Sequence, residues 1–483
     1  MRKYMQKIMK YWVWLFGVCT ALVGAGSESC RVEARRNVQQ AWAPYETVSI
    51  DAIPDFIPAA DPELDEYGGW RGTNVGNPDG FFRVRKIDGR WWMVDPAGNL
   101  FLSKAVACIV PGQSVRQQKK LKDVYGTKEA WAEAEVAFVK QQGFNSAGCW
   151  SSADSFHTNF KARIPYTVYL PAMLTYNRKL KKSGALAEGY AKGGWEGYPW
   201  DVPCVFDEEF DVEADKVISK AAIYANDPYL MGYFIDNELP WKRSALWMCL
   251  CKFPKGHPSQ KAAQTWLDAR KGKKNARMGD VTEEDRREFL AYCLDVYMDK
   301  VTRMLRKYDT DHMYLGSRFH SWSTELTNAP FFKVAGKYAD VISINHYSRW
   351  QPDVETMKKW GEWSGKPFMV TEFYTKGEDS GLPNRTGAGW NVRTQNDRGL
   401  FYENFCSELL KGGTCVGWHW FKYMDNDPEN VKADPSNRDS NKGIVTWDFK
   451  RYDELLKHMK RLNDCTYRLA RFYEKKTKEG QRQ

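Results

Sequence analysis

Two glutamates stand where apolar runs end abruptly, in a pattern suited to cleaving a glycosidic bond. Glu238 follows Asn237 directly after the apolar run 232–235, and Glu372 follows the run 367–371. Glycosidic cleavage needs two carboxyl groups that converge on one bond, one to protonate the leaving oxygen and one to attack the anomeric carbon. Asn-Glu alone is a common dipeptide, but a pair of glutamates at two predicted strand ends indicates an active site.

The segments that would position these glutamates alternate between strand-like and helix-like patterns. Such alternation is typical of parallel βαβ units, and eight strands are the number of a (β/α)8 TIM barrel, whose active site lies where the strands end. An open doubly wound sheet is the alternative, but no G-x-G-x-x-G turn follows an early strand. We therefore predict an α/β fold, a (β/α)8 barrel preceded by a β-hairpin with an Asp88-Gly89 turn. Its strands are expected at residues 101–109, 146–150, 166–170, 231–236, 313–317, 341–345, 368–371 and 414–418.

These strand-end motifs resemble clan A of the glycoside hydrolases. In that clan the acid/base follows Asn at the end of strand four and the nucleophile ends strand seven, so the resemblance implies Glu238 as acid/base and Glu372 as nucleophile. Within the clan the chain is most similar to family 50, the β-agarases, over about residues 70–467. The resemblance implies a retaining hydrolase of β-galactosidic bonds in an agarose- or porphyran-type galactan or its oligosaccharides. The stretches that support it are 80–83, 91–98, 143–151 and 232–241.

Other strand ends supply candidate substrate-binding residues in addition to Asn237. The resemblance implies that Tyr347 hydrogen-bonds the nucleophile and that Trp418 is a stacking platform for the sugar. His346 could bind a sugar hydroxyl or assist the acid/base, although a core histidine is the alternative. Aromatic rings offer flat faces for the C–H faces of sugars. A rim of such groups is completed by Trp150, His320 and Trp322.

The ends of the chain differ in composition from its centre. Basic residues, an apolar run from 11 to 23 and a small-residue site predict a signal peptide over residues 1–25, and hence a periplasmic or extracellular enzyme. Lipid attachment at Cys30 is a weaker alternative. Residues 26–75 are rich in Pro, Asp and Gly and are expected to form an extended arm, residues 76–470 the catalytic domain, and residues 471–483 a frayed tail.

The composition excludes several functions. Removing the signal peptide deletes four basic residues and lowers the net charge from +10 to +6, which is mildly basic. No basic helix or zinc pattern accompanies this charge, so nucleic acid is not an expected partner. The scattered cysteines and the absence of a ligand motif predict no metal and no cofactor. No later apolar run is long enough to span a membrane, and the sequence leaves the oligomeric state open.

Long irregular stretches are expected on the catalytic face, at 171–207, 376–398 and 423–443. The first contains four cations, which nearby acids or an anionic substrate such as a sulfated galactan could compensate; the alternative is that they point into water and only help solubility. Alternative functions are a catalytically silent carbohydrate-binding barrel, a retaining β-glycosidase for another sugar, and a lyase or isomerase that uses Lys104. The four cations are Arg178, Lys179, Lys181 and Lys182.

Overall fold

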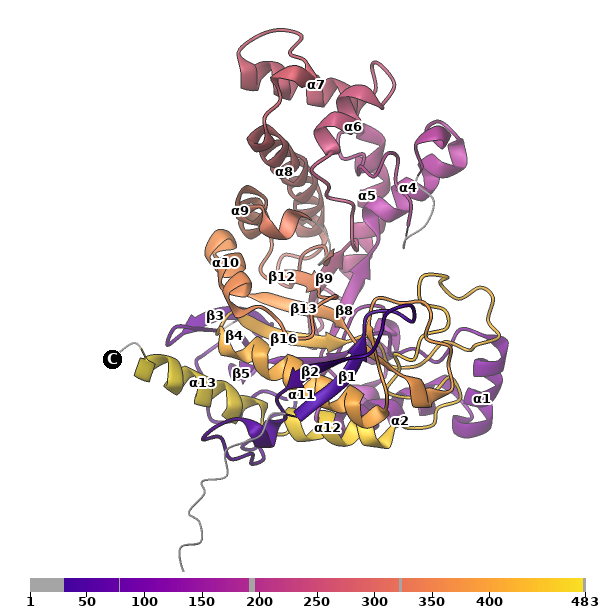
Figure 1. The fold of residues 1–483 in the computed structure, drawn as a ribbon, viewed down its shortest axis with the longest axis vertical. Helices are drawn as coiled ribbons and strands as arrows, with labels where there is room; N and C mark the ends of the chain where they lie inside the picture. The colour runs from indigo at the N-terminus through magenta and orange to yellow at the C-terminus, as the bar shows by residue number, and fades with distance from the viewer. Residues whose placement is uncertain (1–29, 78, 191–195, 321–323, 481–483) are drawn as a thin grey trace, which may run out of the picture.

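A nine-stranded parallel sheet forms the centre of the protein (Figure 1). The computed structural model describes residues 30–480 except 78, 191–195 and 321–323. The strand order is β10-β9-β8-β7-β6-β16-β13-β12-β11, so the last strand along the chain pairs with the first and the sheet curls back on itself. Each of the eight predicted strand segments overlaps a strand of this sheet. The strands are β6 (Ser103–Val106), β7 (Ser146–Ala147), β8 (Tyr166–Leu170), β9 (Leu230–Ile235), β10 (Met313–Tyr314), β11 (Phe319–His320), β12 (Ile342–Asn345), β13 (Phe368–Phe373) and β16 (Cys415–Trp420).

The two ends of this strand order come from one short segment, residues 313–320. Its first half, β10, pairs with β9, and the amide of Leu315 donates to the carbonyl of Tyr233 at 2.8 Å. Its second half, β11, pairs with β12. Gly316 and Arg318 between them have φ angles of +83° and +52°, so the backbone there is not extended and the strand is interrupted. This segment therefore contacts both edges of the sheet.

A small antiparallel sheet covers the strand starts, opposite to the ends that carry the glutamates. Its turn residues Asp88 and Gly89 both have positive φ, as a two-residue hairpin turn requires. Phe82 and Met93 join a buried cluster inside the curled sheet that includes residues at strand starts, such as Met231. This sheet consists of β3 (Arg83–Ile87), β4 (Arg90–Val94) and β5 (Leu100–Phe101).

Helices pack on the outer face of the sheet and begin at polar caps. Thr282 and Thr394 each form a capping box with the Asp three residues later, which satisfies amide groups at the helix start. Trp360 and Phe405 bury their rings between these helices and the strands. The outer helices include α2 (Lys128–Gln141), α5 (Glu208–Ile218), α8 (Glu283–Tyr308), α9 (Ala329–Tyr338), α10 (Val354–Ser364), α11 (Gln395–Lys411) and α12 (Asp453–Asn463).

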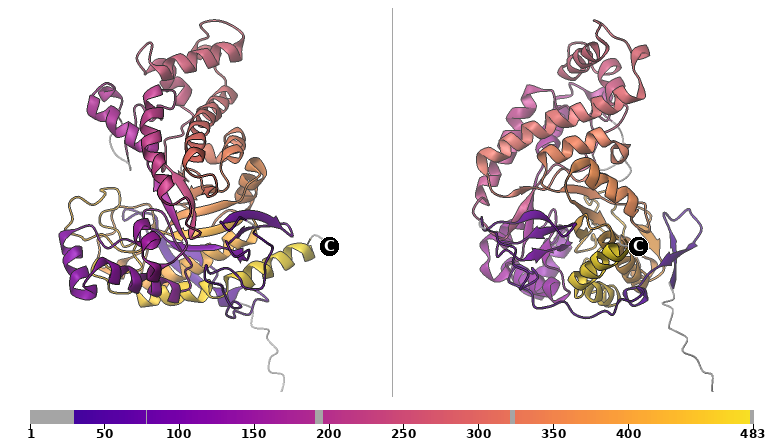
Figure 2. Two further views of the ribbon diagram at one scale, coloured as in Figure 1. Left: turned by 180° about the vertical axis from the view of Figure 1, so that it is seen from behind. Right: turned by 90° about the vertical axis from the view of Figure 1, so that its left-hand side faces the viewer.

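A helix-rich extension projects from one side of the sheet (Figures 1 and 2). It contains α4 (Ala172–Ser183), α6 (Ala245–Cys251) and α7 (Pro258–Lys271) together with much of α5 and α8. The remaining shorter helices are α1 (Val115–Tyr125), α3 (Ala153–Thr158), η1 (Ile50–Ala52), η2 (Phe160–Ala162), η3 (Ala187–Gly189), η4 (Ser219–Ile223), η5 (Met278–Asp280), η6 (Thr324–Thr327) and η7 (Glu378–Ser380).

The four cations predicted to meet an anionic substrate lie on α4, and nearby acids compensate two of them. Lys179 contacts Glu209 at 2.6 Å and Glu213 at 2.9 Å, and Arg178 lies 3.6 Å from Glu196. Lys181 and Lys182 lie exposed on the last turn of the helix. Arg178 and Lys179 therefore have acidic partners within the protein, and a contact of this run with an anionic substrate stays a prediction.

The N-terminal segment contains more regular structure than the expected extended arm. Strands β1 (Cys30–Arg35) and β2 (Ala43–Thr47) form a hairpin, and β1 also pairs with β15 (Trp390–Val392), which in turn pairs with β14 (Thr375–Gly377). Further along, Trp70 bridges to Leu100 in the small antiparallel sheet. Residues 30–75 thus pair with the segment after β13 and with the small antiparallel sheet at the start of the central strands.

The C-terminal residues are not frayed as expected up to residue 480. Helix α13 (Thr466–Gly480) continues through residues 471–480 because its apolar face has partners. The Phe472 ring lies 5.3 Å from that of Phe56, and Lys476 forms a 2.7 Å ion pair with Asp55. Residues 481–483 and the predicted signal peptide, 1–25, lie outside the described residues. Among the described helices, none is long and apolar enough to cross a bilayer.

Candidate active site

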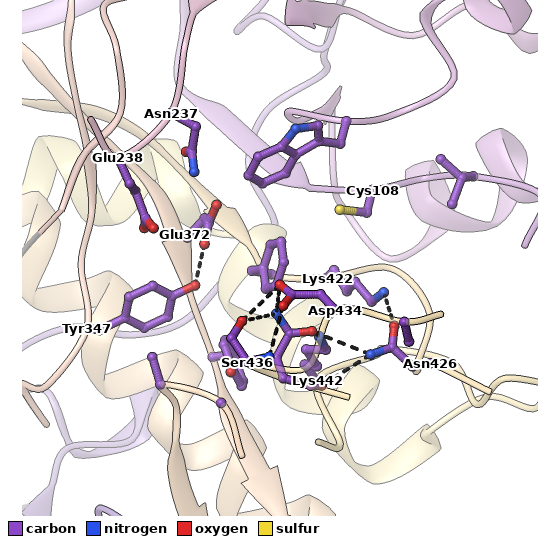
Figure 3. A pocket seen from close by; sticks show the side chains of 18 of the residues that line it. Cys108, Asn237, Glu238, Tyr347, Glu372, Lys422, Asn426, Asp434, Ser436 and Lys442 are labelled. Atoms are coloured by element: carbon purple, nitrogen blue, oxygen red, sulfur yellow. Dashed lines mark hydrogen bonds between the residues drawn. The ribbon is translucent and has the colours of Figure 1, made fainter. Parts of the chain in front are cut away.

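A cavity of about 610 Å³ opens where the strands of the curled sheet end (Figure 3). Glu238 and Glu372 line it on one side, together with Asn237, Tyr347 and His320. The loop that follows β16 forms the opposite wall. The structure therefore brings both predicted catalytic glutamates to one cavity.

The position of Glu238 results from a tight turn directly after β9. Asp236 and Glu238 have φ angles of +61° and +47°, so the chain leaves the strand direction at once. The Asp236 carboxylate accepts hydrogen bonds from the amides of Met173 (2.8 Å) and Leu174 (3.0 Å), at the start of α4. This anchor holds the turn, and the amide of Glu238 donates to the carbonyl of Arg318 at 3.2 Å.

Glu372 lies within β13 and is almost completely buried. Its two carboxylate oxygens have different partners: the Arg318 guanidinium donates to Oε1, and the Tyr347 hydroxyl donates to Oε2. Both partners stabilise the ionised carboxylate and hold its plane. The predicted contact of Tyr347 with this glutamate is thus present in the geometry.

A chain of side chains joins the two glutamates. Arg318 Nε donates to Asn237 Oδ1 at 2.8 Å. Asn345 Nδ2 donates to the same oxygen at 3.1 Å and to Glu238 Oε1 at 2.8 Å. The amide orientation of Asn345 is fixed because its oxygen accepts from Thr371 Oγ1 at 2.8 Å. Since both bonds to Asn237 use its oxygen, its amide nitrogen is a donor available at the cavity wall.

The protonation states of Glu238 and Glu372 depend on their burial and on the positive charge of Arg318. Burial raises the pKa of Glu238 and of Glu372 to about 7. Arg318 is fully buried and permanently charged, so a protonated Glu372 would leave this cation without its counterion, which is strongly unfavourable. Glu372 therefore holds the negative charge. Glu238 has a neutral amide as its closest hydrogen-bond partner and keeps its proton to higher pH.

Aromatic and imidazole groups complete the cavity around the carboxylates. The Arg318 guanidinium lies 4.3 Å from the centroid of the Trp150 ring, so this predicted rim residue also supports the cation. His320 Nε2 is 3.8 Å from Glu238 Oε1, and burial lowers the pKa of this histidine. Phe421, whose ring centroid is 6.0 Å from that of Trp150, extends the apolar surface. Trp322 lies outside the described residues.

Trp418 does not line the cavity, in contrast to the sequence prediction. It is fully buried, and its indole N–H donates to the Tyr402 hydroxyl on α11 at 2.9 Å. The pairing with β13 is irregular here: a bulge places three residues of β16 opposite two of β13 before Trp418, and the offset reverses after it. This bulge changes which side chains face inward. Phe421, three residues further on, is the aromatic side chain after this strand that reaches the cavity.

His346 is the other correction. Its amide donates to the Glu372 carbonyl at 2.8 Å, but its ring lies among the aromatic side chains of the outer helices. The Trp360 and Phe405 rings are 6.1 Å and 5.6 Å from it, and burial lowers its pKa to about 4. It is therefore a neutral core histidine.

Arg318 and Asn345 are side chains of this site that the sequence prediction missed. Asn345 stands in the Asn345-His346-Tyr347 motif, so its place before the tyrosine at a strand end was a usable signal. Arg318 lies in the interrupted fifth segment, where no periodicity marks its direction. In the part of the chain that the structure describes, no three His, Cys, Asp or Glu residues are grouped so as to hold a metal ion.

Comparisons with known proteins show what the whole chain is similar to. No protein-family model matches the sequence. The chain is 25% identical to "Beta-agarase B" of Vibrio sp. (strain JT0107) over 84% of its own length and 50% of the relative, and 23% identical to "Beta-agarase A" of the same strain over 76% and 45%. It thus spans about half the length of the curated relatives it matches.

Solved structures show the same fold. The structure named "Crystal structure of BpGH50" superposes with a TM-score of 0.79 at 27% identity, covering 92% of this chain and 96% of that one. The structure named "Structural analysis of an exo-beta-agarase" has a TM-score of 0.70 at 20% identity, covering 85% and 68%, which is a similarity of fold. In sequence and in fold, the chain is similar to the family 50 glycoside hydrolases.

Proposed function

We propose that this protein is a retaining glycoside hydrolase in which Glu372 is the nucleophile and Glu238 the acid/base. The observation that carries this assignment is the difference between their partners. Glu372 is bound by a buried cation and a tyrosine hydroxyl, which favour its ionised form, whereas Glu238 is bound by the neutral amide of Asn345. One carboxylate is thereby prepared to attack and the other to give a proton.

The reaction then proceeds in two steps. Glu238 transfers its proton to the glycosidic oxygen while a Glu372 oxygen forms a bond to the anomeric carbon, and the bond to the leaving group breaks. The product is a glycosyl ester on Glu372 and a free alcohol. Glu238, now ionised, takes a proton from water, whose oxygen displaces Glu372 and restores the starting state. Two inversions give net retention of configuration.

The substrate we propose is a β-galactosidic bond of an agarose- or porphyran-type galactan or its oligosaccharides. The names of the two curated relatives support this class. The cavity volume and the apolar faces of Trp150 and Phe421 suit sugar rings, which stack their C–H faces on aromatic side chains. Asn237 and His320 add polar contacts for hydroxyl groups.

The finer organisation of the chain is part of the proposal. The curled sheet is a closed (β/α)8 barrel, whose fifth strand is the interrupted segment 313–320, within a catalytic domain at residues 76–470. Support comes from the pairing of that segment with both neighbours. Residues 26–75 form an accessory arm, and residues 1–25 are an export signal for a periplasmic or extracellular enzyme.

The test is hydrolysis of neutral agarose oligosaccharides followed by proton NMR of the newly formed reducing end. We expect the β-anomer to appear first and then to mutarotate. Glu372→Gln should abolish turnover, while the control Glu355→Gln, at an exposed helix start, should leave it unchanged. An α-anomer as first product would exclude the retaining mechanism. Binding of oligosaccharides without any turnover would instead identify a silent carbohydrate-binding protein.

A further inference from the structure

Two lysines lie in the cavity wall that faces the catalytic glutamates (Figure 3). Lys422 directly follows Phe421, and Lys442 stands where the same loop returns to the sheet. Their backbones are adjacent, since the amide of Lys422 donates to the carbonyl of Lys442 at 3.1 Å. Lys442 is 1% exposed and Lys422 is half-buried, so both cations are taken largely out of water.

The hydrogen-bond partners of these lysines are neutral amides. Lys422 Nζ donates to Asn426 Oδ1 at 2.7 Å, and Lys442 Nζ donates to Asn437 Oδ1. Within the described residues, neither ammonium group forms an ion pair with a carboxylate. Each ammonium group has three donors, so further donors on both remain for a ligand in the cavity. Buried cations without a counterion are unfavourable and mark functional sites.

The nearby carboxylates are already engaged with other donors. Asp434 accepts from Ser436 Oγ at 2.8 Å, from the Ser436 amide at 2.9 Å and from Asn437 Nδ2 at 2.9 Å. Asp425 accepts from the amides of Lys442 and Gly443 at 2.8 Å and 2.7 Å, and from two further side chains. These carboxylates therefore shape the loop and do not saturate the lysine ammonium groups.

We propose that Lys422 and Lys442 form a subsite for an anionic substituent of the sugar chain, a sulfate ester, next to the scissile bond. This inference rests on the proposed function. Lys442 Nζ lies 5.3 Å from the centroid of the Phe421 ring. A sugar stacked on that ring would place an equatorial substituent beside the two ammonium groups. An oxyanion offers several acceptor oxygens, which matches two donors from two directions.

The protonation of the lysines is consistent with this subsite. Burial lowers the pKa of Lys422, and it lowers that of Lys442 well below the usual value, where the charge of Lys422 acts in the same direction. Asp434, Asp425 and Cys108 face these groups and oppose the effect. A bound anion favours the charged form and raises both pKa values, so binding should take up protons at any pH where either lysine is partly neutral in the free protein.

The experiment measures binding by calorimetry in the Glu238→Gln background, which prevents turnover. The ligands are a sulfated galactan oligosaccharide, the same oligosaccharide after chemical desulfation, and a uronate-containing oligosaccharide of equal length. Lys422→Gln and Lys442→Gln should each weaken binding of the sulfated ligand about tenfold and leave the desulfated ligand unchanged. Lys450→Gln, at an exposed lysine, is the matched control. Heats in buffers of different ionisation enthalpy report the proton uptake.

Equal affinities for the sulfated and desulfated ligands, or equal losses on both in the lysine variants, would overturn the subsite. Tighter binding of the uronate ligand alone would overturn the sulfate assignment. Because Lys422 is half-buried, its variant tests the inference even where Lys442→Gln does not fold. Failure of the proposed function is seen separately, as absence of hydrolysis of every oligosaccharide by the wild-type protein while the binding difference persists.

Discussion

Tyr347→Phe tests the electrostatic basis of the nucleophile assignment with the loss of one oxygen atom. The hydroxyl donates to Glu372 Oε2, and this bond lowers the pKa of Glu372 against the effect of burial. A hydrogen bond to a charged group contributes about 1.5–3 kcal/mol. Since one pKa unit corresponds to about 1.4 kcal/mol, the variant should raise the pKa of Glu372 by roughly one to two units.

The direction of the effect on activity follows from the role of Glu372. The nucleophile must be ionised, so the acidic limb of kcat/KM reports its pKa in the free enzyme. Removing a donor to the carboxylate raises that pKa, and the acidic limb should move to higher pH by the same one to two units. Activity at low pH therefore falls most.

The measurement is a pH profile of kcat/KM on an oligosaccharide that is itself uncharged. Tyr374→Phe is the matched control, because this buried tyrosine lines the same cavity but its hydroxyl is not bonded to Glu372. An acidic limb at the same pH in Tyr347→Phe and wild type would refute the argument. A shift to lower pH would show that the hydroxyl stabilises the protonated form.

Four further predictions concern the other groups. Glu238→Gln should lose the basic limb of the pH profile on an activated aryl glycoside, which needs no proton; an unchanged limb would assign the acid to another residue. The free energy of unfolding of the same variant should exceed that of wild type by on the order of 2–3 kcal/mol at pH 8 and by little at pH 4. The reason is that the native pKa of Glu238 is about 7, so wild-type stability is lost as pH rises from about 4.5 to 7. Denaturant titrations that give the same difference between variant and wild type at both pH values would contradict this. Phe421→Ala should raise KM at least fivefold, because a sugar ring is expected to stack on this side chain. His346→Phe should keep both limbs of the pH profile in place, because this histidine is neutral above pH 5. In steady-state kinetics, an unchanged KM for Phe421→Ala would assign the sugar contact to another residue, and a shifted limb for His346→Phe would make His346 a titrating group.

The two glutamates that we propose as the catalytic pair could be identified from the sequence because the pattern around each of them is local. Glu238 and Glu372 each follow an apolar run, and the end of a parallel strand determines which edge of the sheet receives the next side chain. Tyr347 came from the resemblance to clan A, which implies a tyrosine at the end of strand six. None of these positions depends on a contact between distant segments.

The predictions for Trp418 and His346 were wrong because the direction of each side chain depends on its position within the strand register. At an irregular pairing in β16, Trp418 points toward α11 and Phe421 lies at the cavity. No residue type in this part of the sequence indicates that the strand has a bulge. His346 is adjacent in sequence to Tyr347 but points to the opposite face of the sheet, as alternation requires. Alternation along the strand from Tyr347 therefore predicts the outward direction of His346.

Residues in irregular segments were the hardest to predict. Lys422 and Lys442 are twenty positions apart in a polar loop, and the loop geometry alone brings them together. Arg318 lies in a strand interrupted by two positive φ angles, where no pattern shows which way its side chain points. The basic run on α4 was more conspicuous in the sequence, yet none of its four cations is among the described residues that line the cavity.

The segment 313–320 has a consequence for how the enzyme gains activity after synthesis. It pairs with β9 through one half and with β12 through the other, and Arg318 lies between these halves. Glu372, the proposed nucleophile, therefore receives its counterion only when two parts of the chain about a hundred residues apart have both assembled on this segment, and such distant pairings form slowly. Catalytic activity should consequently recover later than helix content during refolding.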